Sequence, residues 1–352
     1  MPYKRITNLK SAFDDHGISA FLVTHPTNIR YLTNNVPSSD SWLLVTKKKS
    51  YYITDSRYQE EMKAALPGME VVCRKGSLAE AAVQAARSAR VRKLGFDEHH
   101  FSVAGFKAFK KQVPKSVKLL AANGAVEQLR EVKDASELKC IRKALSVHRQ
   151  CLHYIREYIT PNTTEEKILQ KLKEFITAQG VGFSFDPICA SGPHSSFPHA
   201  RVSRRKLQAQ DIFLLDMGID VEGYKSDLTR MFFFGKIPDL ALRVSNAVYE
   251  AQQCAIRAIA PGKPVAEIDA QARNYLKEKR LNQYFGHGLG HGVGLDIHES
   301  PTVGPASKQI LREGMVLTVE PGVYIPHKFG VRLEEMVLVT KKGCEVLSAS
   351  CH

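Results

Sequence analysis

The chain has 352 residues, a length that predicts about two domains and excludes a peptide hormone or a small disulfide scaffold. Hydrophobic residues make up 43% of the chain and charged residues 24%, so its composition matches neither a disordered protein nor a membrane bundle. The 50 Lys and Arg residues exceed the 36 Asp and Glu residues, and the net charge of +14 fits either a polyanion-binding face or a solvated basic surface.

The seven cysteines are an odd number and form no Cys-x-x-Cys pair, which indicates free thiols in a reducing compartment. The first residues alternate charged and apolar side chains at helical spacing and lack the apolar core of a signal peptide. No apolar run reaches the length of a membrane span. We therefore expect a cytoplasmic protein that has no membrane partner.

From Ile6 to about Ala122, short apolar strands alternate with helical segments, a pattern typical of an α/β domain. A first helix is predicted to end near Gly17, and two more are predicted over 57–65 and 78–90. The predicted strands are 20–24, 42–46, 51–55, 69–73, 93–97 and 118–122.

The rest of the chain mixes long helices with strands and loops, which predicts an α+β domain. Apolar residues recur every three or four positions over about 135–159, as expected for an amphipathic helix. Three further helices are predicted at about 165–179, 240–259 and 265–279. We place the boundary between the two domains after residue 127, which gives domains of 1–127 and 128–352.

Two aspartates interrupt apolar strands on either side of a turn at about 221–223. Asp216 lies in Ile-Phe-Leu-Leu-Asp-Met, and Asp227 leads into the next strand. A hairpin centred on this turn would place the two carboxylates opposite each other, where they repel and lose solvation. A divalent cation would compensate for both effects. The alternative for a lone Asp-x-Gly is a turn-capping or surface residue.

The segment 286–301 contains three histidines among alternating glycines, namely His287, His291 and His298. The first two have the spacing of a zinc-binding helix, but the glycines make a helix unfavourable. We expect a loop or irregular strand that approaches a ligand closely and supplies imidazoles for metal binding or proton transfer. The glycines do not match the dinucleotide-binding pattern.

Two glutamates, Glu320 and Glu334, also lie in apolar segments that we predict to be strands. Each alone could be a surface residue or the partner of an arginine such as Arg332. Two Asp, two Glu and one neutral His together carry a charge that two divalent cations would cancel. Oxygen ligands with one imidazole suit Mn, Co, Fe or Zn, and two neighbouring metals are typical of hydrolytic enzymes.

These residues resemble the ligands of the pita-bread metallopeptidases, the group that contains methionine aminopeptidase, aminopeptidase P and prolidase. Their order and spacing are similar to those of the prolidase branch, and the first 125 or so residues, with Asn-Ile-Arg-Tyr-Leu-Thr, resemble a creatinase-like N-terminal domain. The resemblance implies two divalent metal ions (Mn, Co, Zn or Fe) and a pita-bread catalytic domain. The implied metal ligands are Asp216, Asp227, His291, Glu320 and Glu334.

The resemblance also implies catalytic roles for three residues. His199 and His298 would hold the substrate carbonyl and stabilise the tetrahedral intermediate. Glu320, besides binding metal, would shuttle a proton from the bridging water.

Two further residues would bind substrate. His287 would line the pocket for the proline side of the peptide, and Arg332 would orient Glu334 or contact the substrate. Glu335, next to the last ligand, is the alternative for that position.

The expected function is that of a dinuclear metal-dependent exopeptidase that hydrolyses Xaa-Pro bonds through a metal-bridging hydroxide. A bond to proline has no N–H and a fixed ring torsion, so enzymes that bind substrates as hydrogen-bonded strands use it poorly. The substrate would be a small peptide with proline at its second position, either a dipeptide (prolidase) or a longer peptide (aminopeptidase P). By resemblance the protein would be a homodimer, without a nucleic-acid partner.

The main alternative is an inactive relative that binds peptides or polyanions. The net charge and the basic run 201–206 favour it, whereas the presence of all five implied ligands argues against it. A metal-free creatinase-like enzyme is disfavoured by the same ligands, and methionine aminopeptidase by the additional N-terminal domain.

Overall fold

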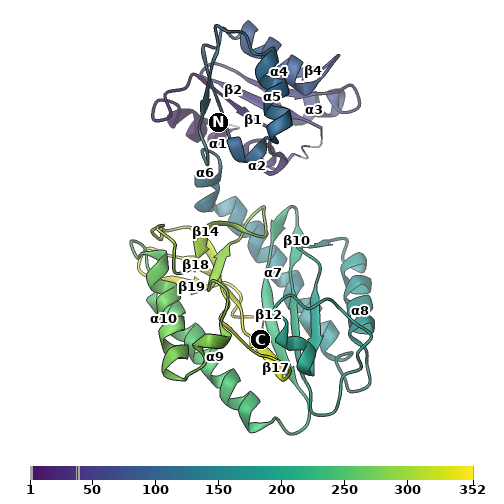
Figure 1. Ribbon diagram of the computed structural model, residues 1–352. Helices are drawn as coiled ribbons and strands as arrows, with labels where there is room; N and C mark the ends of the chain where they lie inside the picture. Colours follow the sequence, from purple (N-terminus) through teal and green to yellow (C-terminus); the bar gives the residue numbers. More distant parts are fainter. Residues whose placement is uncertain (1–2, 37, 39, 352) are drawn as a thin grey trace. The chain divides into compact units, whose positions relative to one another are not determined.

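The computed structural model describes residues 3–36, 38 and 40–351, which form two units divided after Arg130 (Figure 1). We call them the N-terminal unit and the C-terminal unit and describe each by itself. No helix in the described part of the chain is long and apolar enough to cross a membrane. All seven cysteines are free thiols, as the sequence predicts.

The N-terminal unit is built on a six-stranded sheet with the order β4-β3-β2-β1-β5-β6. The six predicted strands are all present, and their pairing is mixed. The β1 strand runs antiparallel to β2 and parallel to β5, and β5 runs parallel to β6. The strands are β1 (Ala20–Val23), β2 (Trp42–Thr46), β3 (Ser50–Thr54), β4 (Glu70–Cys73), β5 (Lys93–Phe96) and β6 (Lys118–Ala121).

Six helices accompany this sheet, of which three were predicted. The first ends at Ser11 instead of near Gly17, and α4 begins at a capping box formed by Ser77 and Glu80. The short helices α2, α5 and α6 were missed. The helices are α1 (Lys4–Ser11), α2 (Pro26–Leu32), α3 (Gln59–Ala65), α4 (Leu78–Ser88), α5 (Val103–Gln112) and α6 (Glu127–Glu131).

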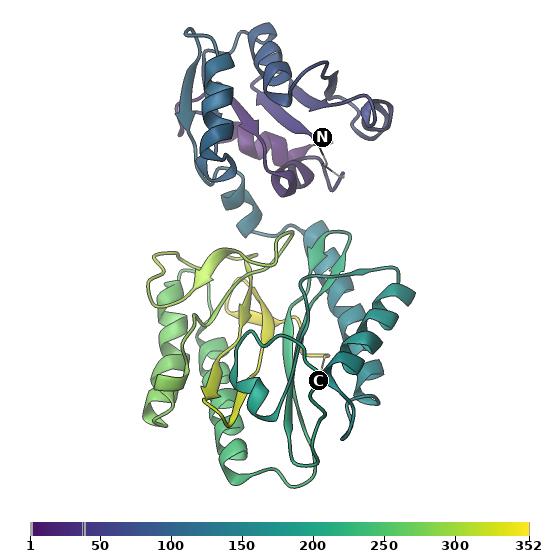
Figure 2. The same ribbon diagram turned by 45° about the vertical axis from the view of Figure 1, so that its right-hand side comes forward.

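The C-terminal unit contains the four predicted helices. Asp134 and Glu137 form a capping box at the start of α7, and Thr164 caps α8, so local hydrogen bonds define both helix starts. In two views the strands lie between the pair α7 and α8 and the pair α9 and α10 (Figures 1 and 2). The helices are α7 (Ala135–Arg156), α8 (Glu165–Ala178), α9 (Asp239–Ala258) and α10 (Val265–Glu278).

The strands between these helix pairs form four small sheets, with the orders β12-β9-β8, β11-β10-β7, β14-β13-β15-β18-β19 and β16-β17. This mixture of helices and mainly antiparallel strands is the predicted α+β architecture. The strands are β7 (Gly182–Phe183), β8 (Ile188–Ser191), β9 (Ile212–Met217), β10 (Ile219–Val221), β11 (Tyr224–Lys225), β12 (Leu228–Phe233), β13 (Gly290–Gly292), β14 (Glu299–Val303), β15 (Val316–Val319), β16 (Gly322–Ile325), β17 (Phe329–Arg332), β18 (Glu335–Val339) and β19 (Cys344–Val346).

The pairing of β9 with β12 corrects the predicted register. Asp216 lies opposite Thr229, not opposite Asp227. The cause is the two-residue turn Glu222-Gly223, in which both residues have positive φ, 55° and 86°, as a tight hairpin turn requires. This turn centres the hairpin later in the chain than predicted, so Asp227 lies diagonal to Asp216.

Candidate metal centre

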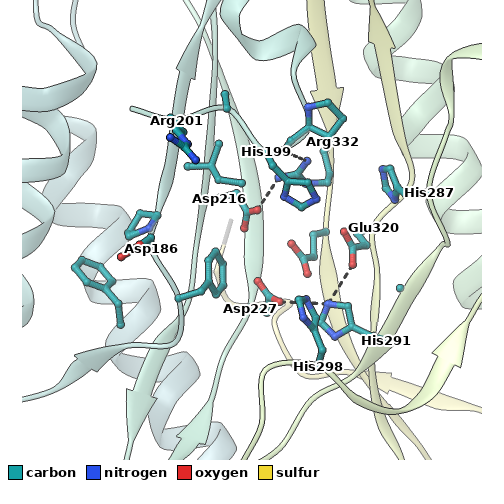
Figure 3. A pocket seen from close by; sticks show the side chains of 18 of the residues that line it. Asp186, His199, Arg201, Asp216, Asp227, His287, His291, His298, Glu320 and Arg332 are labelled. Carbon is teal, nitrogen blue, oxygen red and sulfur yellow. Dashed lines mark hydrogen bonds and ion pairs between the residues drawn. The ribbon is translucent and has the colours of Figure 1, made fainter. Parts of the chain in front are cut away.

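A cavity of about 1100 Å³ lies within the C-terminal unit, and all nine predicted site residues line it (Figure 3). They come from segments that are far apart in the sequence, so the fold brings the whole predicted set together. The nine residues are His199, Asp216, Asp227, His287, His291, His298, Glu320, Arg332 and Glu334.

The five predicted metal ligands come from two facing groups of strands. Asp216 lies in β9, and Asp227 directly precedes β12. His291 lies in β13, Glu320 directly follows β15, and Glu334 lies between β17 and β18. The prediction that both glutamates lie inside strands is therefore wrong, because Glu320 and Glu334 each lie in a short connection between two strands.

Glycines on either side of His291 allow its strand to pack closely. A Cβ atom on Gly290 would lie 2.2 Å from the carbonyl oxygen of Thr318, and one on Gly292 would lie 2.2 Å from that of Ser300. The strand has a register shift between His291 and Gly292, which confirms the predicted irregular strand. Only glycine permits these backbone contacts, and they fix the position of His291.

The His291 imidazole faces the carboxylates. Its Nδ1 atom lies 3.1 Å from the carbonyl oxygen of Gly292, which can only accept, so Nδ1 carries the proton. Its Nε2 atom lies 3.3 Å from Glu320 Oε1 and 3.5 Å from Asp227 Oδ2. The possible ligand atoms of Asp227, His291 and Glu334 all lie within 4.8 Å of one another. This tautomer and orientation are those of a metal-binding histidine.

Two buried carboxylate oxygens in the cavity, Asp216 Oδ1 and Glu334 Oε1, have no hydrogen-bond partner among the described residues. A buried anionic oxygen without a donor or cation is costly, and such atoms are rare in folded proteins. A divalent cation would satisfy both oxygens. The residues present therefore fit a divalent metal, with oxygen ligands and one imidazole.

The electrostatics of the cavity lead to the same conclusion. Burial, followed by the neighbouring carboxylates, raises the pKa of Asp227 and that of Glu334 well above their usual range. Burial also raises the pKa of Asp216, although Arg332 opposes this effect. Burial acts to raise the pKa of Glu320 too, but the neighbouring His291 makes the net shift downward. Additional positive charge is needed to keep all four carboxylates ionised.

Arg332 supplies part of that charge. Its side chain is buried, and Nη2 donates to Asp216 Oδ2 over 2.6 Å. Nη1 donates to the Tyr324 hydroxyl over 2.7 Å, and Nε donates to Thr229 Oγ1 over 3.0 Å. Thr229 in turn donates to Glu334 Oε2 over 2.8 Å. Arg332 thus contacts Asp216 directly and reaches Glu334 only through Thr229.

The structure also distinguishes the two adjacent glutamates. Glu334 lines the cavity, whereas Glu335 begins β18 and forms an ion pair with Arg230, with 3.1 Å between Nη2 and Oε1. Glu335 also accepts a hydrogen bond from Ser348. The geometry therefore selects Glu334 as the acid that faces the other candidate ligands.

Three histidines surround the carboxylates. The ring of His298 is perpendicular to that of His291, with 4.3 Å between the centroids. His287 Nε2 lies 3.1 Å from the Tyr324 hydroxyl. Burial lowers the pKa of both His287 and His298, so both are neutral imidazoles at neutral pH. His199 follows the 3₁₀ helix 192–196 and lines the same cavity (Figure 3).

Glu165 is a structural support of the site that sequence reasoning missed. This fully buried carboxylate is the first residue of α8. It accepts hydrogen bonds from the backbone N–H and the hydroxyl of both Ser191 and Ser203, over 2.7–3.0 Å, and it also contacts His194. These bonds tie together the ends of the segment that carries His199. Nothing in the sequence distinguishes Glu165 from an ordinary acidic residue at a helix start.

Replacing Glu165 with Gln is expected to lower the free energy of unfolding by about 1.5–3 kcal/mol, because the amide nitrogen cannot accept the bonds that the lost oxygen accepted. Urea unfolding measures this change. Glu166→Gln is the matched control, since Glu166 is exposed and only faces Arg204 at 3.5 Å on the surface. Equal stability of the two variants would contradict the supporting role of Glu165.

The basic run 201–206 does not form a single basic face. Arg201 lines the cavity, and Arg204 is an exposed residue beside Glu166. Arg205 is bonded to Asp211 and to Ser191. This distribution does not favour the polyanion-binding alternative.

Comparison with known proteins places this chain in a family. The chain is 33% identical over 347 residues to the uncharacterized peptidase YqhT of Bacillus subtilis (strain 168), with 98% of each chain covered. The fold matches an Xaa-Pro dipeptidase from Bacillus anthracis with a TM-score of 0.94 and 35% identity, over 98% of this chain and 97% of that one. It matches an X-Pro aminopeptidase from Thermotoga maritima MSB8 with a TM-score of 0.88 and 30% identity, over 96% and 97%.

Two protein-family models match most of the chain. The model of the creatinase/prolidase N-terminal domain matches residues 5–132, and the model of metallopeptidase family M24 matches residues 139–341. The predicted creatinase-like α/β domain followed by a pita-bread α+β domain is confirmed. The chain therefore belongs to metallopeptidase family M24 and carries a creatinase/prolidase N-terminal domain before its peptidase domain.

Proposed function

We propose that this metallopeptidase is an exopeptidase that hydrolyses Xaa-Pro bonds with two divalent metal ions. The observation that carries the proposal is the convergence, in one cavity, of four carboxylates, three of them buried, and a histidine whose Nε2 faces them. Two similar solved structures, an Xaa-Pro dipeptidase and an X-Pro aminopeptidase, support the choice of substrate.

The proposed metal ligands are the five residues named from the sequence. Their four carboxylates carry a formal charge of about −4 when ionised, and Arg332 offsets one unit of it through Asp216. Oxygen donors with one imidazole suit Mn, Co, Zn or Fe. Bound metals would polarise the scissile carbonyl and supply a nucleophile from water at neutral pH. The ligands are Asp216, Asp227, His291, Glu320 and Glu334.

The remaining steps fall to side chains of the cavity. Negative charge that develops on the scissile carbonyl oxygen needs N–H donors, and the imidazoles of His199 and His298 are the proposed donors. The nitrogen of proline leaves as a secondary amine and must gain a proton. Glu320 lines the cavity, 3.3 Å from His291 Nε2, and is the proposed group that accepts a proton and returns it to this nitrogen.

The proline ring is proposed to bind against His287. Its imidazole packs edge-on against Phe285, with 5.0 Å between centroids, and lies 5.6 Å from the Tyr324 ring. These aromatic contacts hold a neutral ring at the cavity wall, which can pack against an apolar pyrrolidine. A wall of this kind requires no N–H from the substrate, and a bond to proline has none.

The test compares three substrates, Ala-Pro, Ala-Pro-Ala and Ala-Ala, with protein loaded with Mn, Co or Zn. We expect cleavage of at least one proline peptide and slower cleavage of Ala-Ala. A preference for Ala-Pro would identify a dipeptidase, and a preference for Ala-Pro-Ala an aminopeptidase P. Equal cleavage of Ala-Ala would refute proline specificity, and no cleavage by folded, metal-loaded protein would refute the hydrolase itself.

The proposal also includes a cytoplasmic location and a homodimer. Seven free thiols support a reducing compartment. The homodimer rests on resemblance to the family, and sedimentation equilibrium of the full-length chain would test it.

A further inference from the structure

We propose that the N-terminal unit holds a separate site for a divalent transition-metal ion such as Zn²⁺, formed by His25, His100 and Glu127. Each residue offers one ligand atom, and these three atoms lie within 4.8 Å of one another. All three residues belong to the N-terminal unit, and none lines the catalytic cavity. The proposal is therefore independent of the peptidase function.

The topology of the sheet explains why these residues meet. His25 follows β1, His100 follows β5 and Glu127 follows β6, and these strands are three parallel neighbours. From β1 the chain continues to β2 on one side, whereas from β5 it continues to β6 on the other side. Such a reversal leaves a crevice at the carboxyl ends of the strands, where open α/β sheets bind ligands.

The side chains converge as metal ligands do. His100 Nε2 lies 2.7 Å from Glu127 Oε1. The rings of His25 and His100 stack with 4.1 Å between centroids and 15° between planes. The side chains of His100 and Glu127 are 21% and 31% exposed, so the cluster is only partly covered.

The carboxylate of Glu127 is held at one oxygen and open at the other. Asn28 Nδ2 donates to Glu127 Oε1 over 2.6 Å, and Arg130 Nη1 donates to Asn28 Oδ1 over 2.9 Å. Glu127 Oε2 is buried and has no hydrogen-bond partner among the described residues. Outer partners that orient one oxygen while the other stays available are typical of metal-binding carboxylates.

The donor set indicates which ion would bind. Two imidazole nitrogens and one carboxylate oxygen suit Zn²⁺, Co²⁺ or Ni²⁺ better than Mg²⁺ or Ca²⁺, which prefer oxygen ligands alone. The cluster has three ligands and none of them is a thiolate, unlike a closed structural zinc site with four ligands. A fourth position would remain for water or another ligand.

The test counts zinc in the full-length chain. The double variant Asp227→Asn, Glu334→Gln removes two ligands of the catalytic cavity, so that the N-terminal site is counted separately. After chelator treatment, dialysis against Zn²⁺ and elemental analysis, we expect about one bound ion per chain in this background. Adding His100→Ala or the nearly isosteric Glu127→Gln is expected to abolish its binding, and Asn28→Ala to weaken it roughly 10–100-fold.

His99→Ala in the same background is the matched control. His99 is 71% exposed, lies beside His100 and contacts Asp97 instead of the cluster. Its replacement is expected to leave the zinc count unchanged. A count that survives both His100→Ala and Glu127→Gln, or one that falls equally with His99→Ala, would overturn the proposal. Because the readout is bound metal, failure of the peptidase proposal would not affect it.

Discussion

Replacing Asp227 with Asn is expected to cause a large loss of kcat/KM for peptide hydrolysis. Loss of a residue that only supports a metal ligand reduces activity roughly 10–100-fold, and loss of the ligand itself is expected to exceed this. The Asp227 carboxylate is buried, faces His291 and lies within ligand distance of Glu334. Asn keeps the size of the side chain but lacks the charge that holds a cation. Steady-state kinetics and metal content of the purified protein measure the effect.

Asp220→Asn is the control for this substitution. Asp220 belongs to the same hairpin but bonds Lys225 and the backbone of Gly223 away from the candidate ligands. The Asp220→Asn variant is expected to keep full metal content and activity. Full activity of Asp227→Asn, or an equal loss in both variants, would contradict the assignment of Asp227 as a ligand.

In the metal-free protein, Asp227→Asn is expected to increase the free energy of unfolding. Burial raises the pKa of Asp227 in the folded state, whereas its unfolded value is about 3.9. The folded protein therefore binds more protons than the unfolded chain between these two values, and its stability falls as pH rises through this window. In chelator, Asp227→Asn is expected to be more stable than the wild type at neutral pH and to lose this difference in acid.

Replacing Arg332 with Ala is expected to lower the free energy of unfolding of the metal-free protein by about 3–5 kcal/mol, the cost of leaving a buried charge without its partner. The Arg332 side chain is 4% exposed and that of Asp216 is 11% exposed. Its loss would also leave the Tyr324 hydroxyl and Thr229 without a donor. Urea unfolding in chelator measures the change.

Arg142→Ala is the matched control, because Arg142 forms a two-bond pair with Glu345 on the surface. Exposed pairs contribute about 0–1 kcal/mol, so this variant is expected to unfold almost like the wild type. Bound metal is expected to reduce the defect of Arg332→Ala, because it would compensate the charge of Asp216. The account is contradicted if both arginine variants lose the same stability.

Much of the fold follows from local sequence patterns. The six N-terminal strands and the four long C-terminal helices lie where apolar runs and helical spacing predict them. The helix α2 was missed because it is short and begins with Pro26, and α5 because it contains Gly105 and buries only Phe109. The β9–β12 register was wrong because Glu222 adopts positive φ, which its residue type does not indicate.

The candidate site could be predicted from residues whose chemistry conflicts with their surroundings. Acids in apolar strands and histidines among glycines cost stability unless they act together, and the seven residues chosen in this way line one cavity. His199 and Arg332 line it too, but only the family resemblance indicated them. Partners from distant segments could not be predicted. Thr229, Tyr324 and Glu165 look ordinary in the sequence, and only the folded chain shows that they hold Glu334, Arg332 and the His199 segment. The choice between Glu334 and Glu335 likewise needed the structure.

The most direct test of the central claim is the release of the N-terminal alanine from Ala-Pro or Ala-Pro-Ala as chelator-stripped protein is titrated with Mn²⁺, Co²⁺ or Zn²⁺. The account predicts no hydrolysis by the stripped protein and a rise in activity that follows the filling of the Asp216, Asp227, His291, Glu320 and Glu334 site. Hydrolysis that persists without metal, or that is equally restored in Asp227→Asn, would contradict it.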